Sequence, residues 1–480
     1  MINTRIKVHD KFTVEFKIGF VTSDKENDKN EYKINTWIFL PNGLDINKYT
    51  YSKEQFYTDI KSNVRLITPV FSLSDILTGD ESPFTRLKKA YAALLDNQDN
   101  VAMESFTYHS KMFLNIMKSA LRESLVLIIE EKDEEKQLEE IRHYVANVCQ
   151  ITLEYRKLRN KPEIDKEHFL FGDEYLGQIV EQNTFELHRF LCENANYETI
   201  KHLLKPIIEG EEMNKQQMDY SIPDENDDKK NSLILIKRSL LKKLVESDLY
   251  LQRIKKEDGA LAREFYYSLG AGLAMIFATV ISFFAAQKYG NFTSTLFFIL
   301  VISYIFKDRI KEFSRTYFAS KLDQKYFDRK WKVSIRNQPI GWIKEAFDFI
   351  DEENVPEKII ELRDKLPLVK AENKVYDEKV ILFRTRVQLS KKDIETYKEY
   401  RLTGINDIIR LNLTSFIKKM DNPTNYLYLP DEQEGYRSFT ATRVYALYFV
   451  IECRSDNDTY FKKYRLLLNR NGINDVSQID

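Results

Sequence analysis

The N-terminal part of the chain alternates apolar and polar residues with the two-residue period of a β-strand. In KFTVEFKIGFV, residues 11–21, the apolar positions facing one way are Phe12, Val14, Phe16, Ile18 and Phe20. EYKINTWIFL, residues 31–40, repeats the pattern after the polar stretch SDKENDKN. Two such strands around a polar turn are typical of a half-buried antiparallel hairpin. We therefore predict a β-rich N-terminal module over residues 1–80.

From residue 82 to residue 208 the apolar period becomes helical. Ser82-Pro83 predicts a helix start, because proline is favoured at the first helical position. One predicted helix has a long apolar face, made of Phe106, Phe113, Met117, Leu121 and Ile128. The other helices of this bundle module are predicted at about 133–160, at about 174–195 and up to Pro206.

The middle of the chain is predicted to be a linker followed by long helices. Residues 209–231 have almost no apolar content, which predicts a flexible polar linker. Helical periodicity resumes at residue 232, and we expect stalk helices to lead into and out of two apolar runs over residues 232–334. A helical connector is predicted over 335–370, with Pro356 in the first turn of its second helix and Pro367 at its end.

The last part of the chain is predicted to be an α+β module over residues 375–480. VILFRTRVQL (380–389) alternates as a strand does, and two further strand patterns flank the turn at residues 455–458. Between them, GINDIIRLNLTSFIKKM places its apolar residues on one helical face: Ile405, Ile408, Ile409, Leu413, Phe416, Ile417 and Met420. The pattern leaves open whether the N- and C-terminal strands join one sheet.

Two uncharged runs predict a transmembrane helical hairpin. Phe265 to Ala286 contains 22 residues without a charge, which as a helix measures about 30 Å, the thickness of a bilayer hydrocarbon core. The second run, Asn291 to Phe306, has 16 residues and measures about 24 Å. The fold class we expect is therefore an α+β membrane-anchored protein, with β-rich ends around an all-helical middle that carries a two-span hairpin. The alternative is a buried helical hairpin of a soluble protein.

Basic residues gather on the outer flanks of the two runs: Arg253, Lys255, Lys256, Arg263, Lys307, Arg309, Lys311 and Arg315. The loop between the runs has only Lys288. By the positive-inside rule this asymmetry places both termini in the cytoplasm. We expect an integral protein of a bacterial inner membrane.

Small residues recur at every fourth position of the first run: Gly270, Ala274, Ala278, Ser282 and Ala286. Helices in lipid associate through close backbone approach, which small side chains allow. We interpret the five residues as a helix-packing seam, whose partner is either the second run or another copy of the chain. Neither run contains an ionisable residue, which disfavours a transporter.

Composition narrows the function further. The chain has 73 basic and 74 acidic residues, so no global attraction to nucleic acid is expected. Three widely spaced cysteines fit a reducing compartment, and the first residues lack the apolar segment of a signal peptide. Phosphate-binding loops, the nucleophile-elbow motif and the HExxH motif are absent from the sequence, which disfavours the common NTPase, dehydrogenase and hydrolase classes.

Metal ligation is the strongest remaining argument for an enzyme. Glu140 and His143 stand three residues apart, and His188 and Cys192 four apart, so each pair could share a helical face. One Glu-x-x-His is expected by chance in a chain this rich in glutamate, so we predict neither a metal nor another cofactor. His109 is interpreted as a core histidine, and His168 is expected in a loop near Asp173 and Glu174.

The leading functional hypothesis is a cytoplasmic sensor, adaptor or scaffold without catalytic activity, anchored in the bilayer. Its expected partners are lipid and either another protein or a second copy of the chain. One alternative is an effector that disrupts the bilayer when triggered. The other is a membrane-tethered enzyme with a metal or nucleotide site that no motif reveals.

Basic residues interleaved with tyrosines on the C-terminal strands are interpreted as the solvent-exposed face of a sheet.

Overall fold

The computed structural model of the chain describes residues 2–23, 29–97, 99–160, 166–193, 197–290, 293–363, 378–395, 400–431, 435–455 and 458–479. It divides into two compact units. Unit 1 comprises Met1–Val64, Leu251–Tyr397 and Gly404–Asp480, and unit 2 comprises Arg65–Tyr250 and Lys398–Thr403. The two β-rich ends of the chain, which the sequence placed in separate modules, therefore belong to one unit.

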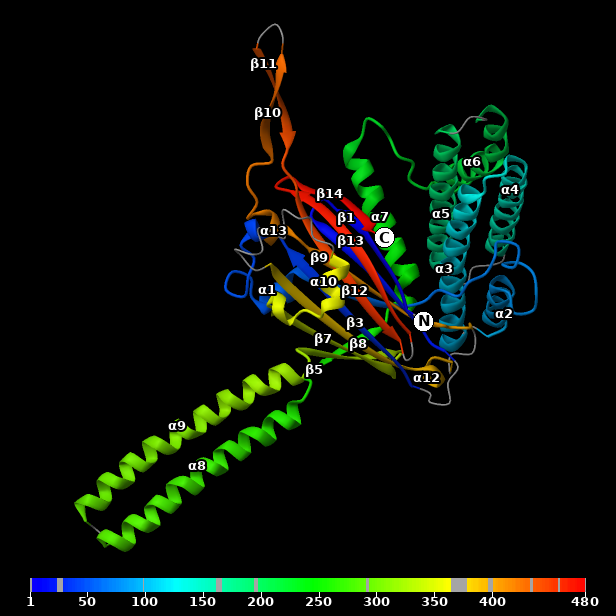
Figure 1. Cartoon of the computed structure of the whole chain (residues 1–480). Coiled ribbons are helices and arrows are strands. Elements are labelled where there is room, and N and C mark those ends of the chain that lie inside the picture. Colours follow the sequence, from blue (N-terminus) through cyan, green and yellow to red (C-terminus); the bar gives the residue numbers. More distant parts are fainter. Residues whose placement is uncertain are drawn as a thin grey trace. The chain divides into compact units, whose positions relative to one another are not determined.

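Strands are the most numerous elements of unit 1 (Figure 1). They are β1 (Ile2–Asp10), β2 (Thr13–Val21), β3 (Lys29–Leu40), β4 (Ile60–Leu66), β5 (Gln252–Lys256), β6 (Arg329–Ile335), β7 (Gln338–Ile350), β8 (Lys379–Ser390), β9 (Gly404–Asn412), β10 (Thr424–Asp431), β11 (Gly435–Thr442), β12 (Tyr445–Ser455), β13 (Asp458–Asn469) and β14 (Gly472–Ile479). Short helices accompany them: α1 (Lys53–Asp59), α10 (Glu357–Arg363), α12 (Lys391–Glu395) and α13 (Thr414–Ile417).

These strands form two large sheets and one ribbon. A four-stranded sheet has the order β1-β2-β9-β4, and an eight-stranded sheet has the order β14-β13-β12-β3-β8-β7-β6-β5. The two sheets pack face to face, since the rings of Phe16 on β2 and Phe449 on β12 lie 5.4 Å apart. Strands β10 and β11 form a separate two-stranded ribbon. Strand β3 pairs with both β8 and β12, so N- and C-terminal strands share one sheet.

The predicted N-terminal hairpin is wrong, because its two strands lie in different sheets. Strand β2 pairs with β1 and β9, whereas β3 pairs with β8 and β12. Nearly all of β2 is buried, including Glu15, which forms ion pairs with Lys7 and Arg410. Alternation determines which side chains share a face, but it does not determine which strand pairs with which.

Two segments predicted to be helical are strands. Residues 404–412 form β9, in which Ile405, Ile409 and Leu411 are buried on alternate positions, and only the short α13 follows. The first predicted helix of the connector is β7, between β6 and β8 in the large sheet. A short apolar run fits either period, and burial between sheets favours the strand. Helix α10 does begin directly after Pro356, while Pro367 lies outside the described residues.

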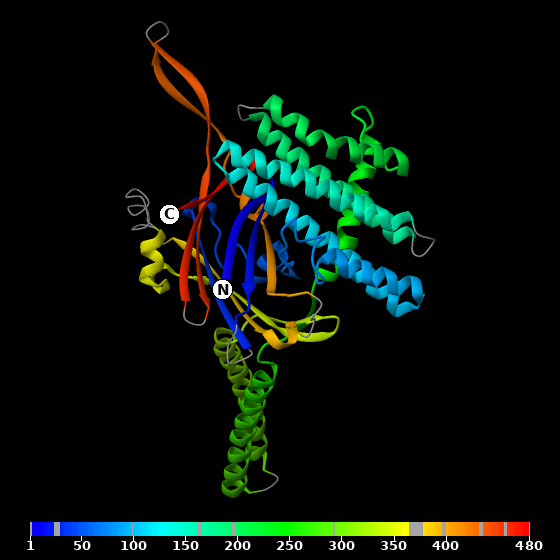
Figure 2. The ribbon, with the colours of Figure 1, turned by 90° about the vertical axis from the view of Figure 1, so that its right-hand side faces the viewer.

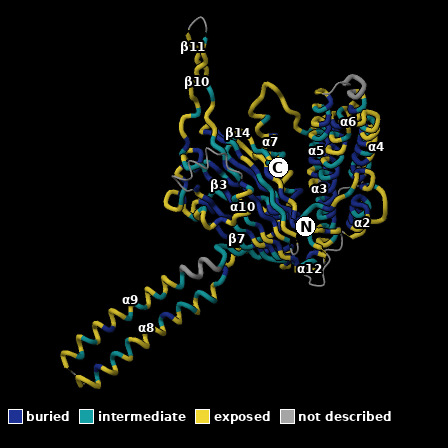
Figure 3. Tube along the Cα trace, in the orientation of Figure 1, coloured by how far each residue is buried: buried dark blue, intermediate teal, exposed yellow. Residues whose placement is uncertain are grey.

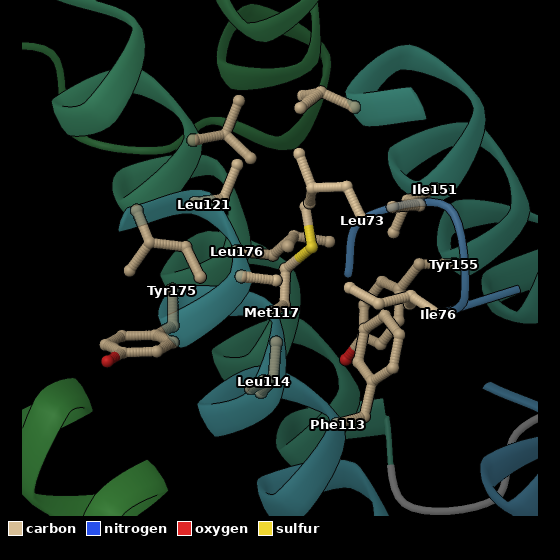
Figure 4. Packing of buried hydrophobic residues seen from close by; sticks show 14 of the residues in the cluster. Leu73, Ile76, Phe113, Leu114, Met117, Leu121, Ile151, Tyr155, Tyr175 and Leu176 are labelled. Carbon is tan, nitrogen blue, oxygen red and sulfur yellow. The ribbon is translucent and has the colours of Figure 1, made fainter. Parts of the chain in front are cut away.

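Unit 2 is a helical bundle. Its long helices are α2 (Pro83–Asp96), α3 (Asn100–Glu130), α4 (Glu134–Lys157), α5 (Lys166–Glu193), α6 (Tyr197–Met218) and α7 (Asp228–Glu246). Ser82 caps α2 as predicted, accepting a hydrogen bond of 3.1 Å from the backbone N–H of Thr85. In the core, Phe113 of α3 lies beside Tyr155 of α4 (Figure 4), and the two rings are stacked 5.3 Å apart.

Helices extend well into the segment predicted to be a flexible linker. Helix α6 passes through Pro206 and ends at Met218, and α7 begins at Asp228, so only residues 219–227 lie between them. Glu211 and Asn214 of α6 are buried. Because polar side chains can be buried when they are paired, composition alone was misleading here. Helix α5 begins at Lys166, eight residues before the predicted start, and this places His168 on a helix and not in a loop.

A long helical hairpin connects two neighbouring strands of unit 1. Helices α8 (Ala260–Tyr289) and α9 (Ser294–Lys325) lie side by side, as Figure 2 shows from a second direction. They follow β5 and precede β6, which pair antiparallel. The predicted continuous stalk into the first run is therefore interrupted by β5. Among the described residues, α8 is the one helix long and apolar enough to cross a membrane. The start of the second run, Asn291 and Phe292, lies outside the described residues.

Candidate functional site

The apolar part of the hairpin is exposed. Phe283 and Phe284 of α8 and Phe297 and Phe298 of α9 each leave more than 60% of their surface uncovered. Figure 3 shows exposed and half-buried residues along both helices. An apolar surface of this extent marks a site of contact with lipid or with another protein.

The small residues of α8 lie on the side that faces α9. Gly270 and Ala274 are buried, and Ala278, Ser282 and Ala286 are half-buried. A Cβ atom built on Gly270 would lie 2.9 Å from the Cβ of Ser314 on α9, which is closer than real contacts allow. The second helix of the same chain therefore occupies this end of the seam. Association of the seam with a second copy stays a prediction.

Gly270→Leu is expected to loosen the hairpin, because a large side chain there must push Ser314 away. Overpacking of this kind typically costs about 1–3 kcal/mol, so amides of both helices around the contact should exchange hydrogen on the order of tenfold faster. Hydrogen-exchange mass spectrometry in detergent measures this. Gly272→Leu is the matched control, because no atom of the part of the chain that the structure describes lies within 4 Å of the Cβ position at Gly272. Equal exchange in both variants would contradict the tight α8–α9 contact.

The basic residues expected to flank the spans divide between sheet and helices. Arg253, Lys255 and Lys256 lie on β5, and Arg263 lies in the first turns of α8. The remaining four lie on α9: Lys307, Arg309, Lys311 and Arg315. Lys307 Nζ lies 4.0 Å from the ring centre of Tyr304, and the Arg315 guanidinium 5.3 Å from that of Tyr267. Cations paired with tyrosines are typical of a membrane interface.

Two aspartates attach the legs of the hairpin to unit 1. Asp258, just before α8, pairs with Lys344 of β7 at 2.8 Å and accepts a hydrogen bond from the backbone N–H of Phe327. Asp328, just after α9, pairs with Lys53 of α1 at 2.7 Å and accepts hydrogen bonds from the Tyr57 hydroxyl and the Phe347 backbone. Both legs are thus bound to the eight-stranded sheet by charge-assisted hydrogen bonds.

Next to these aspartates, a chain of polar contacts links the two sheets. The Ser62 hydroxyl of β4 donates to Asp407 of β9 at 2.5 Å. Arg253 of β5 donates to the same hydroxyl oxygen at 2.9 Å, and its guanidinium lies 4.9 Å from the ring centre of Trp331 on β6. The Trp331 indole N–H donates to Glu345 of β7 at 2.9 Å. We call these five residues the root cluster.

The surroundings of the two carboxyl groups of the root cluster raise the pKa of both. Burial raises the pKa of Asp407 to about 7, and the nearby Glu345 adds to this effect against the Ser62 hydrogen bond and Arg253. Burial also raises the pKa of Glu345, although Trp331, Arg253 and Arg329 oppose it. One Asp407 oxygen has no hydrogen-bond partner among the described residues. The cluster can therefore take up a proton near neutral pH.

Sequence reasoning missed the root cluster entirely. Its residues come from five strands, and they stand as far apart in the chain as Ser62 and Asp407. The one available signal was Asp407 itself, an acid within the apolar run GINDIIRL. When that run is interpreted as a helix, Asp407 falls on the polar face and is expected to be an ordinary exposed residue.

The four residues considered as metal ligands do not gather into one site. Glu140 and His143 are exposed on α4, where His143 faces Glu139 at 3.7 Å. His188 Nδ1 and Cys192 Sγ of α5 lie 3.6 Å apart. The described part of the chain contains no group of three or more His, Cys, Asp or Glu side chains placed to hold a metal ion. His109 is buried and forms a hydrogen bond of 3.1 Å with Tyr400.

Unit 2 contains a buried ion network. Arg156 of α4 donates to Asp173 at 2.9 Å and to Glu211 at 2.6 Å. Asp173 accepts further hydrogen bonds from Asn214 and Tyr220. Burial raises the pKa of Glu211 although the Arg156 charge lowers it. Because the carboxylates of Asp173 and Glu211 share the Arg156 guanidinium, we interpret the network as a structural link between α4, α5 and α6.

Several C-terminal basic side chains contact their own unit. Arg384 pairs with Asp348 at 2.7 Å, Arg443 pairs with Asp421 at 2.6 Å, and Lys462 donates to the carbonyl of Thr4 at 2.6 Å. Such contacts are those of a sheet surface, and they add no support for nucleic-acid binding.

Comparison of the chain with families of known proteins, with curated proteins and with solved structures finds no match.

Proposed function

We propose that the protein is a membrane-anchored sensor or adaptor without catalytic activity, held at a bacterial inner membrane by α8 and α9 as a two-span hairpin. Units 1 and 2 then lie in the cytoplasm. The observation that carries the proposal is the exposed apolar surface of the hairpin, joined to a well-packed sheet by Asp258 and Asp328. Lipid is the partner for which an all-round apolar pair of helices is suited.

The root cluster supports a sensor. A displacement of either leg moves β5 or β6, which carry Arg253 and Trp331. These two residues connect Glu345 in one sheet with Ser62 and Asp407 in the other. A movement of the hairpin would therefore alter contacts between the sheets. Conversely, protonation of the cluster would alter the position of the hairpin.

The β10–β11 ribbon supports an adaptor. Its exposed large side chains are Tyr426, Leu427, Tyr428, Leu429, Tyr436 and Phe439. A two-stranded hairpin is marginally stable in water by itself, and both of its edges can pair with another strand. A protein partner that adds a strand to this ribbon would cover these groups.

The anchor is tested by replacing Ala260–Lys325 with a short Gly-Ser linker. Gly259 and Tyr326 lie close together, since a Cβ on Gly259 would meet the Tyr326 ring at 2.6 Å, so a short linker can close the gap. We expect the whole chain to float with phosphatidylcholine–phosphatidylglycerol vesicles and the shortened chain to remain folded and unbound. Circular dichroism checks the strand content. Flotation of the shortened chain would overturn the proposal.

The same vesicles distinguish an adaptor from an effector. Loaded with a fluorescent dye, they should retain it after the protein binds. Dye release would contradict the adaptor and favour the bilayer-disrupting effector that the sequence also allows.

A further inference from the structure

The hairpin carries charged residues at two levels, and the distance between these levels limits the hydrocarbon thickness that it can cross. At the tip, Lys288 is exposed one residue before the end of α8. Towards the root, the first charges of α9 are Lys307, Asp308 and Arg309. The residues between these levels are uncharged on both helices.

Contacts between the helices show which residues lie at the same level. Gly270 meets Ser314, and the rings of Tyr266 and Phe318 lie 5.2 Å apart. Both helices rise by 1.5 Å per residue. Counting equally along both from the Gly270 contact places Lys307 level with Phe277, near the middle of the uncharged run of α8.

This register shortens the part of the hairpin that is apolar all round. We call this part the apolar girdle, and it consists of Ala278–Gln287 of α8 and, level with them, Phe297–Phe306 of α9. The 10 residues on each helix measure about 15 Å. The lysine side chains at both levels extend towards water, which allows a hydrocarbon layer of about 20 Å. A typical hydrocarbon core measures about 30 Å.

Other depths of insertion would bury charge. If the uncharged run of α8 filled a normal bilayer, Lys307, Asp308 and Arg309 would lie inside the hydrocarbon, which is costly. If instead the hairpin entered only one leaflet, Lys288 would lie near the bilayer centre, where its charge has a similar free-energy cost. A thin hydrocarbon layer leaves both levels at a surface, where lysine side chains extend towards water.

We infer that the surface recognised by the hairpin is a bilayer whose hydrocarbon is about 20 Å thick around it. This inference rests on the proposed function, in which the hairpin enters a membrane. The girdle crosses completely, with Lys288 at the far surface and Lys307, Asp308 and Arg309 at the near one. Rootward of the girdle, α8 stays apolar while α9 is charged, an amphipathic pair suited to the headgroup layer.

The test is flotation of the full chain with vesicles of phosphatidylcholine and phosphatidylglycerol, three to one, over a series of monounsaturated acyl chains from myristoleoyl to erucoyl. We expect binding on the order of tenfold stronger in the thinnest bilayers than in the thickest. Equal binding across the series, or stronger binding in thick bilayers, would overturn the inference. Binding to none of them would instead count against the proposed function.

Access to the tip tests complete crossing. The native cysteines Cys149, Cys192 and Cys453 are first replaced by serine, since all three are free and Cys192 is exposed. Tyr289→Cys in this chain, once bound, should react with a maleimide trapped inside the vesicles and not with one added outside. Reaction with neither reagent indicates a tip within the hydrocarbon and would overturn the inference while leaving the anchor intact.

Removal of the near charges should change the preferred thickness. Lys307→Leu, Asp308→Leu and Arg309→Leu together extend the uncharged part of α9 to Ile310, to about 25 Å. We expect the strongest binding to move to longer acyl chains. Asp228→Leu, Lys229→Leu and Lys230→Leu on α7 form the matched control, since they remove the same charges from exposed positions outside the hairpin. An unchanged optimum in the α9 variant would contradict the role of these charges.

Discussion

Replacing Phe283 and Phe298 with lysine is expected to release the chain from membranes. Both side chains are exposed and lie in the apolar girdle, one on each helix. At the centre of a span, exchange of phenylalanine for lysine costs about 3 kcal/mol. Two exchanges therefore cost about 6 kcal/mol, which lowers partition into the bilayer on the order of 10⁴-fold. Vesicle flotation measures the bound fraction directly.

The matched control places the same kind of change on another exposed apolar surface. Leu233 and Leu235 of α7 are exposed apolar residues of another helix. Leu233→Lys together with Leu235→Lys adds the same charge as the hairpin variant. We expect this variant to float as the unchanged chain does. If the control detached and the hairpin variant remained bound, α7 and not the hairpin would be the membrane contact.

Asp407→Asn is expected to stabilise unit 1 above neutral pH. In the folded chain the pKa of Asp407 is about 7, against 3.8 without its surroundings. A raised pKa means that the folded state binds the proton more tightly. The stability contribution of this group is therefore complete below about pH 4 and is lost as the pH rises through 7. The difference corresponds to about 4 kcal/mol at most.

Asparagine cannot ionise, yet its side-chain oxygen still accepts the Ser62 hydrogen bond. The variant should therefore lose less stability in urea between pH 4 and pH 8 than the unchanged chain does. Asp475→Asn is the control, because Asp475 is exposed. A profile of Asp407→Asn parallel to that of the unchanged chain would show that Asp407 is ionised throughout. Glu345 would then be the next carboxyl to replace.

Long periodic segments could be predicted from the sequence. Helix α3 carries its buried residues at the positions that periodicity selects, such as Phe106 and Phe113. Ser82 begins α2 because its hydroxyl can accept the free N–H of Thr85, a strictly local interaction. The uncharged run of α8 could be located because a helix of that length satisfies its own backbone hydrogen bonds. In each case the deciding interactions join residues close in the chain.

The tertiary structure decided strand pairing, the identity of short elements and the root cluster. Residues 404–412 form a strand because β2 offers a partner for their backbone, and no local pattern reveals that partner. Glu211 and Asn214 are buried because Arg156 and Asp173, distant in the chain, pair with them. The level of Lys307 depends on the register of α9 against α8. Period and composition describe one segment at a time, whereas pairing, burial of charge and register are properties of two segments in contact.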